Sequence, residues 1–179
     1  MTQHRRLIGL TGTNAAGKGE AAAFFRHRGF AYFSLSDVIR DELKRKGLDL
    51  DRNNLIRTGN ALRRQFGSDV LALRILEKVT GDSVIDSIRN PDEVEFLRRH
   101  DDFMLLAIDA PLGLRFERAR RRGRNESALT LEEFQAKENE ERTDDPASQQ
   151  LTQVMRMADH IILNDSTLQD FHRKLEAFL

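Results

Sequence analysis

A loop near the amino terminus combines glycines with a lysine at the spacing of a phosphate-binding site. The segment Gly12-Thr13-Asn14-Ala15-Ala16-Gly17-Lys18 follows an apolar run and precedes a run of helical period, Glu20 to His27. Glycine lets the backbone curl so that successive N–H groups face phosphate oxygens, and the helix N-terminus adds partial positive charge. Lys18 supplies a full charge for the β- and γ-phosphates. The pattern therefore predicts a P-loop that binds a nucleoside triphosphate, and its context disfavours an ordinary glycine-bearing turn.

The two residues after this lysine depart from the usual P-loop. Gly19 stands where a Ser or Thr normally ligates Mg²⁺, so that hydroxyl ligand is missing. Glu20 follows, and it can either hold magnesium-bound water or favour the first turn of the helix, as an acid does there. The helix interpretation is preferred, and both residues are kept within the predicted nucleotide-binding loop.

Acids and arginines follow two later apolar runs. After the first of them, Ser36 or Asp37 can cap a helix that carries Arg40 one turn further on. The second run leads into Val84-Ile85-Asp86-Ser87-Ile88-Arg89, an acid with an arginine close behind. Open α/β sheets bind ligands at the carboxyl ends of their strands, and the planar fork of arginine holds two phosphate oxygens. We therefore expect these two arginines to be functional and not solvated surface charges.

A third basic feature is the segment from Arg115 to Arg124, which holds six arginines and one acid. Arg118 and Arg122 lie on one helix face by their i, i+4 spacing, where they can neutralise a phosphoryl group in transfer. One alternative is ion pairing with the acidic segment from Glu132 to Asp145. A nucleic-acid patch is disfavoured, because lysine plus arginine (29) equals aspartate plus glutamate (29) over the whole chain.

Together these motifs resemble the adenylate-kinase-like nucleoside-monophosphate kinases, and the resemblance runs from Leu7 to Leu179. Asp37-x-x-Arg40 is similar to the acceptor-phosphate motif of that family. Asp86 and Arg89 resemble its second acid and arginine pair, although the family spacing is one residue longer. The resemblance implies that Arg40 and Arg89 bind the acceptor phosphate and that Asp86 holds Mg²⁺ through water.

The resemblance also implies a lid. Asp109-Ala110-Pro111 leads into Arg118 and Arg122, which is similar to the arginines at the lid entrance of the family. Arg118 would also contact ATP, Arg124 the acceptor, and Arg142 would belong to the lid. The residues with an implied catalytic role are Lys18, Asp37, Asp86, Arg118 and Arg122. The acceptor is bound by Asp37, Arg40, Arg89 and Arg124.

The function implied is a kinase that uses ATP and Mg²⁺ to phosphorylate a nucleoside or deoxynucleoside monophosphate. One alternative is phosphorylation of a ribose hydroxyl, as in the dephospho-coenzyme A kinases, which the segment Ala158 to Asp165 resembles. Those enzymes carry two acids where this chain has Leu35 and Asp37, so only the second acid is kept. Another alternative, a regulatory NTPase, is disfavoured because a hydrolase has no acceptor to hold. The base of the acceptor stays open, since the adenine-reading glutamine of adenylate kinases has no counterpart after Arg89.

Five apolar runs alternate with helical segments, which predicts a three-layer α/β fold with a parallel five-stranded sheet. The runs are Leu7 to Leu10, Ala31 to Phe33, Ser83 to Asp86, Phe103 to Asp109 and Ile161 to Leu163. Their order 2-3-1-4-5 is implied by the resemblance. Capping boxes predict helix starts at Asn90-Pro91-Asp92-Glu93 and at Thr130-Leu131-Glu132-Glu133. The whole chain, 1–179, is expected to form one P-loop kinase domain, with the acceptor region at about 35–70 and a lid insertion at about 123–150.

Composition narrows the remaining classes. The chain has no cysteine, which excludes disulfides, thiolate metal sites and a cysteine nucleophile. The apolar run near the amino terminus is too short for a secretory signal, and Phe103 to Ile108 is far too short to span a membrane. With balanced charge as well, a cytoplasmic protein with a small-molecule nucleotide acceptor is expected, and neither nucleic acid nor membrane as a partner. Oligomeric state is left open.

Overall fold

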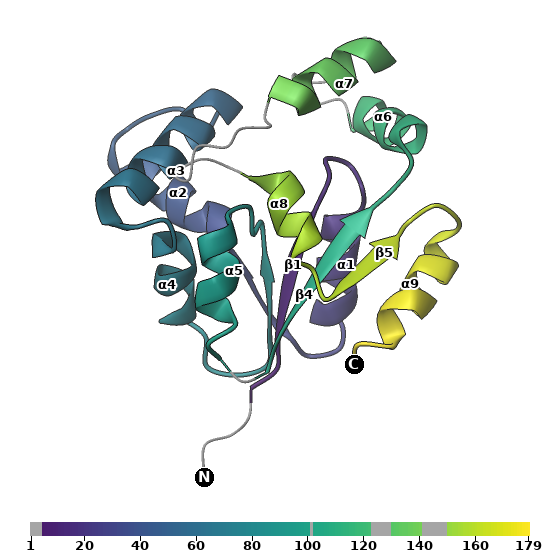
Figure 1. Ribbon diagram of the computed structural model, residues 1–179, viewed down its shortest axis with the longest axis horizontal. Coiled ribbons are helices and arrows are strands. Elements are labelled where there is room, and N and C mark those ends of the chain that lie inside the picture. Colours follow the sequence, from purple (N-terminus) through teal and green to yellow (C-terminus); the bar gives the residue numbers. More distant parts are fainter. Residues whose placement is uncertain (1–4, 101, 123–129, 141–149) are drawn as a thin grey trace.

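The computed structural model describes residues 5–100, 102–122, 130–140 and 150–179. Its centre is a parallel sheet (Figure 1) with the strand order β2-β3-β1-β4-β5. The strands are β1 (Leu7–Gly12), β2 (Ala31–Ser34), β3 (Ser83–Asp86), β4 (Phe103–Asp109) and β5 (His160–Leu163). The predicted α/β class, the five parallel strands and their order are confirmed.

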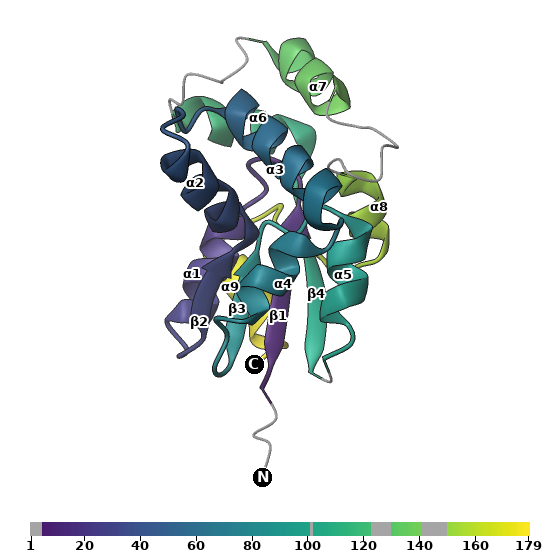
Figure 2. The same ribbon diagram turned by 90° about the vertical axis from the view of Figure 1, so that its left-hand side faces the viewer.

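Helices cover both faces of this sheet (Figures 1 and 2), which gives three layers. One apolar core packs α1 (Lys18–Arg26) and α9 (Leu168–Glu176) on one face. A second core packs the other face against α2 (Leu35–Arg45), α3 (Arg52–Phe66), α4 (Val70–Leu76), α5 (Pro91–Leu97) and α8 (Leu151–Arg156). Strand residues alternate between the two cores: Leu7 enters the second core and Ile8 the first, as the period of two in a β-strand requires.

Two of the three expected helix starts are confirmed. The Glu93 carboxylate accepts a hydrogen bond from the Asn90 N–H at 3.0 Å, and Glu133 and Thr130 cap each other. The start of α2 was predicted wrongly, because Ser34 is its N-cap and accepts the Ser36 N–H at 3.3 Å. The helix begins directly at the end of β2, so Ser36 and Asp37 lie inside its first turn and not at its cap.

Helices α6 (Leu112–Arg121) and α7 (Leu131–Glu140) lie above the carboxyl ends of the strands in Figure 1. Phe134 of α7 is only 4% exposed and packs against Phe116 of α6 at 5.9 Å between ring centroids. Arg115 of α6 pairs with Glu138 of α7 and donates to the carbonyl oxygens of Ala110 and Asn14. Ion pairing between the arginine cluster and the acidic segment therefore holds for Arg115, which ties α7 to the P-loop. None of the described helices combines the length and apolar character that a membrane crossing requires.

Candidate active site

The P-loop connects β1 to α1, and two of its positions accept only glycine. Gly12 has φ +141°, and a Cβ there would lie 2.0 Å from the carbonyl oxygen of Ile108. Gly17 has φ +115°, and its Cβ would lie 2.4 Å from the side-chain nitrogen of Asn164. Positive φ disfavours a side chain at both positions, and the close contact with backbone at Gly12 and with the buried Asn164 side chain at Gly17 leaves no room for one.

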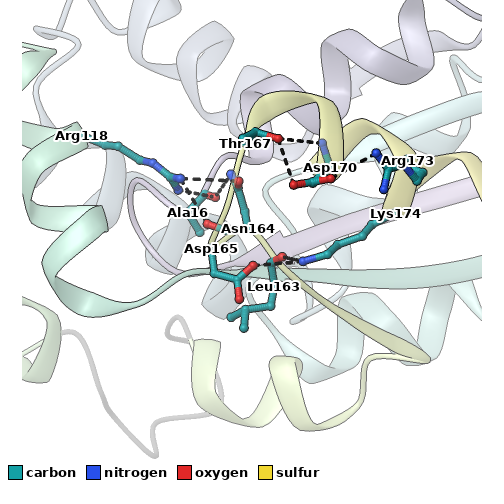
Figure 3. A network of polar contacts seen from close by, with 9 residues as sticks. All are labelled: Ala16, Arg118, Leu163, Asn164, Asp165, Thr167, Asp170, Arg173 and Lys174. Atoms are coloured by element: carbon teal, nitrogen blue, oxygen red, sulfur yellow. Dashed lines mark hydrogen bonds and ion pairs between the residues drawn. The ribbon is translucent and has the colours of Figure 1, made fainter.

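Residues from distant segments hold the back of this loop (Figure 3). The Asn164 Nδ2 donates to the Ala16 carbonyl at 2.8 Å, and Arg118 donates to the Ala16 and Asn164 carbonyls at 3.4 and 3.1 Å. Glu20 faces outward to α9, where its Oε1 lies 2.7 Å from His172 Nε2. The geometry thus favours a structural role for Glu20, and it gives Arg118 contacts that position the loop. Its predicted contact with ATP stays a prediction.

A cavity of about 1260 Å³ runs from the P-loop to α2, α3 and α8. It exceeds the roughly 300–1,000 Å³ of a typical small-molecule site, so it has room for a donor and an acceptor together. Most of the described residues with predicted roles line it: Thr13, Asn14, Ala15, Gly17, Lys18 and Gly19 of the P-loop, and Arg40, Asp86, Arg89 and Arg122 beyond it. Asp37 does not line it and instead pairs with Arg40 at 2.7 Å. Arg124 and Arg142 lie outside the described residues.

Lys18 is held at the mouth of the P-loop by the loop itself. Its Nζ donates to the carbonyl oxygens of Gly12 and Thr13 at 2.7 and 2.9 Å. Burial lowers the pKa of Lys18 to about 7, the positive charge of Arg89 adds to this, and Asp86 opposes it. Burial and the neighbouring arginines therefore disfavour the charged form of the lysine, and a bound polyphosphate would favour it.

The cavity is also lined by three arginines that the sequence analysis did not identify as functional: Arg52, Arg63 and Arg156. Arg63 is paired with Glu93 of α5 in the interior, with side-chain exposures of 2% and 0%. The local sequence does not distinguish Arg63 from the exposed Arg64 beside it, and only the packing of α3 buries Arg63 with Leu62. Asp109 was seen only as part of the segment that leads to the lid. In the structure it lines the same cavity and accepts a hydrogen bond from the Thr13 hydroxyl at 2.7 Å.

The sequence profile of an AAA domain matches residues 8–144 of the chain. The UPF0200 protein PH1008 of Pyrococcus horikoshii is 35% identical over 179 residues, which cover 95% of this chain and 94% of the relative. The chain belongs to the UPF0200 family and contains an AAA domain.

Solved structures with this fold include two that span nearly the whole UPF0200 chain. TT1252 from Thermus thermophilus superposes with a TM-score of 0.63 at 24% identity, over 98% of this chain and 97% of the other. A shikimate kinase from Bacteroides thetaiotaomicron superposes with a TM-score of 0.61 at 16% identity, over 97% of each chain. At these identities the likeness shows a P-loop kinase fold alone.

Two separate carboxylates of the UPF0200 site, and not a cluster of them, are placed where they could hold Mg²⁺. Asp86, at the end of β3, lines the cavity, and its Oδ1 accepts the Ser87 N–H at 2.6 Å. Within the described ranges no three acidic or histidine side chains gather as a metal cage. Mg²⁺ usually keeps several waters and takes one or two carboxylates together with substrate phosphates. Asp86 at the end of β3 and Asp109 at the end of β4 lie on either side of β1 and both line the cavity. They fit a Mg²⁺ ion that is held by one or two carboxylates together with water and substrate phosphates.

The depressed pKa of Lys18 predicts that ATP binding takes up a proton. At pH 8 a lysine with a pKa of about 7 is roughly nine-tenths neutral, and adjacent phosphates would raise that pKa and recharge it. We expect uptake of close to one proton per ATP, measured by calorimetry at pH 8 in two buffers of different ionisation enthalpy. Affinity should correspondingly fall as the pH rises above 7. Lys18→Arg is the control, because arginine stays charged throughout; equal uptake in both proteins would contradict the assignment.

Proposed function

We propose that this UPF0200 protein is a phosphotransferase that moves the γ-phosphoryl group of ATP onto the phosphate of a nucleoside or deoxynucleoside monophosphate. The observation that carries the proposal is the single cavity that joins Lys18 of the P-loop to Arg40 and Arg89 on the acceptor side. A regulatory NTPase needs the first of these features and not the second. A kinase that brings two polyanionic substrates together needs both, as well as the volume to hold them.

In this reaction an oxygen of the acceptor phosphate forms a bond to the γ-phosphorus, and the bond to the β–γ bridging oxygen breaks. ADP leaves with the electron pair. Lys18 and the loop amides stabilise the β- and γ-oxygens, while Arg122 neutralises the phosphoryl group and Arg40 and Arg89 hold the acceptor in line. Asp86 would hold Mg²⁺ through water, and the bound ion would supply further neutralisation of the phosphate charge. Catalysis is positioning and electrostatics, because the acceptor is already an anion.

The site of Asp37 weighs against a hydroxyl acceptor. A ribose hydroxyl loses its proton during transfer and needs a base within hydrogen-bond reach. Asp37 is the acid that the resemblance to dephospho-coenzyme A kinases offered for that task. In the structure its Oδ1 lies 2.7 Å from Arg40 Nη1, and the side chain does not line the cavity. Asp37 thus supports the proposal as a residue that orients Arg40.

Replacing Asp37 by asparagine separates the two chemistries. A phosphomonoester has a second pKa near ~6 and is largely dianionic at pH 7, so no protein base is needed. We expect a modest fall in kcat, with the larger effect on acceptor KM through a displaced Arg40. A fall in kcat of about three orders of magnitude with unchanged acceptor KM, in a variant with native circular dichroism, would instead assign a general base.

The experiment that tests the proposed function is a screen of ATP consumption against a panel of acceptors. The panel holds the nucleoside monophosphates, the deoxynucleoside monophosphates and dephospho-coenzyme A, each with Mg²⁺. We expect stoichiometric conversion of a monophosphate to a diphosphate, dependent on Lys18. ADP formation that no acceptor accelerates would replace the kinase by a regulatory NTPase, and turnover of dephospho-coenzyme A alone would establish the hydroxyl kinase.

A further inference from the structure

Arg63 carries a buried nitrogen that its ion pair does not use. Its Nε and Nη2 donate to the Oε1 of Glu93 at 3.0 and 2.7 Å, and its side chain is only 2% exposed. Its Nη1 is buried as well, yet it has no hydrogen-bond partner among the described residues. Arg63 also lines the large cavity on the acceptor side. A buried donor without a partner is costly to stability, and a ligand in the cavity would supply the missing acceptor.

The backbone of α3 approaches this nitrogen closely. Gly59 lies one turn before Arg63 on α3, and a Cβ at Gly59 would come within 3.5 Å of Arg63 Nη1. The same Cβ would lie 2.9 Å from the Cδ1 of Ile39, so only a glycine fits between Ile39 and the guanidinium at this point. Arg63 therefore combines a fixed orientation, imposed by Glu93, with a buried donor that no described residue accepts from.

The same carboxylate fixes a second arginine of the acceptor side. Glu93 Oε2 accepts hydrogen bonds from the backbone N–H groups of Arg89 and Asn90, both at 3.0 Å. Glu93 thereby ties the loop that carries Arg89 to the helix that carries Arg63. One buried carboxylate thus holds the guanidinium of Arg63 and the backbone from which the side chain of Arg89 starts.

Two neighbouring guanidiniums act on Arg89. Burial lowers the pKa of Arg89, and the nearby charges of Arg52 and Arg63 lower it further, while Asp86 and Glu93 oppose them. The positive charges of Arg52 and Arg63 therefore repel that of Arg89. A group with two negative charges would relieve the repulsion, and a phosphomonoester also matches the donor geometry of arginine.

We propose that Arg63 binds the phosphate of the acceptor directly through Nη1, opposite Arg89, and that Glu93 is the residue that positions both arginines. The proposal rests on the proposed function and extends it, because it names a phosphomonoester dianion as the group that the deep end of the acceptor cavity recognises. Arg40 then holds the outer side of the same phosphate.

The test measures binding and not turnover, so that it can fail independently of the kinase assignment. Calorimetric titrations would compare AMP, GMP, CMP and UMP with the four matching nucleosides. In the native protein we expect a preference for at least one nucleotide over its nucleoside. The double variant Arg63→Gln/Glu93→Gln, which leaves no buried charge unpaired, should reduce that preference about 10- to 100-fold with nucleoside binding unchanged.

Two further variants keep the experiment decisive. Arg57→Gln removes an exposed arginine of the same helix that does not line the cavity, and it should leave the preference intact. Arg63→Lys keeps a positive charge to pair with Glu93 but lacks the second arm of the guanidinium. It should lose part of the preference for nucleotide over nucleoside, and it provides the test if the double variant unfolds. A full nucleotide preference in a folded Arg63 variant would overturn the proposal, whether or not the protein transfers phosphoryl groups.

A carboxylate is the other anion that this geometry accepts, and shikimate serves as its probe. Tighter binding of shikimate than of any mononucleotide, lost in the Arg63 variants, would overturn the phosphate assignment. Absence of any nucleotide-over-nucleoside preference in the native protein would do the same. Phosphate preference without phosphoryl transfer would leave the Arg63 site standing and remove the proposed function.

Discussion

Replacement of Lys18 by alanine is expected to lower the rate of phosphoryl transfer by about 10³-fold while the fold stays intact. The ammonium group is the charge that the P-loop aims at the γ-phosphate, and its loss leaves the developing negative charge without its nearest counterion. Among the described residues, the Lys18 ammonium group donates to the carbonyl oxygens of Gly12 and Thr13 alone. Because burial already disfavours the charged lysine, its removal costs the folded state little.

Single-turnover rates with saturating ATP measure this effect, and thermal unfolding checks the fold. Lys78→Ala is the matched control, since Lys78 is exposed beyond α4 and does not line the cavity. A Lys18→Ala protein that transfers phosphate at the native rate would refute the assignment of the P-loop lysine.

The largest effect on stability is expected from Glu93→Ala. This substitution leaves the guanidinium of Arg63 buried without its counterion, and it removes the acceptor for the N–H groups of Arg89 and Asn90. Breaking a buried ion pair by deleting one partner typically costs about 3–5 kcal/mol of unfolding free energy. That is a large part of the total stability of a domain of this size.

Urea unfolding of the native protein and the variant gives this difference in unfolding free energy. Glu95→Ala, two residues further along the same helix, is the control, because Glu95 is exposed and its closest cation, Arg98, lies 3.9 Å away. The control should change stability by less than about 0.5 kcal/mol. If Glu93→Ala proves as stable as the control, the ion pair between Arg63 and Glu93 does not stabilise the fold. The contacts of Glu93 with Arg63 and with the Arg89 backbone would then serve ligand binding alone.

Several features of the site followed from the sequence because their physics is local. The P-loop pattern needs only the seven consecutive residues Gly12 to Lys18 after a buried strand, and Gly12 and Gly17 occupy the backbone positions that exclude a side chain. Asn90 and Glu93 form a capping box because both partners lie within one helical turn. The strand positions followed from the apolar runs, with small differences: β1 continues to Gly12, β2 to Ser34, and β5 starts at His160.

Other features were beyond the sequence because their partners are far apart along the chain. Local rules predicted the N-cap of α2 two or three residues too late. Ser34, Ser36 and Asp37 are all residue types that cap helices, and only the length of β2 selects Ser34. Glu20 meets His172 from 152 residues away, and Arg118 meets Asn164 from 46 residues away. The residues next to an arginine in a charged run do not indicate which distant carbonyl oxygen its guanidinium will contact.

The sequence by itself thus determined the fold class, the phosphate-binding loop and the arginines that follow strand ends, because periodicity, capping and backbone conformation act over a few residues. The tertiary structure decided which charges face the cavity. Asp37 turns to Arg40, Arg118 supports the loop from behind, and Arg63 enters the acceptor side although it resembles any other helical arginine. The direction of a side chain on a helix depends on how that helix packs against the sheet, and this packing is set by contacts between segments that are distant in sequence.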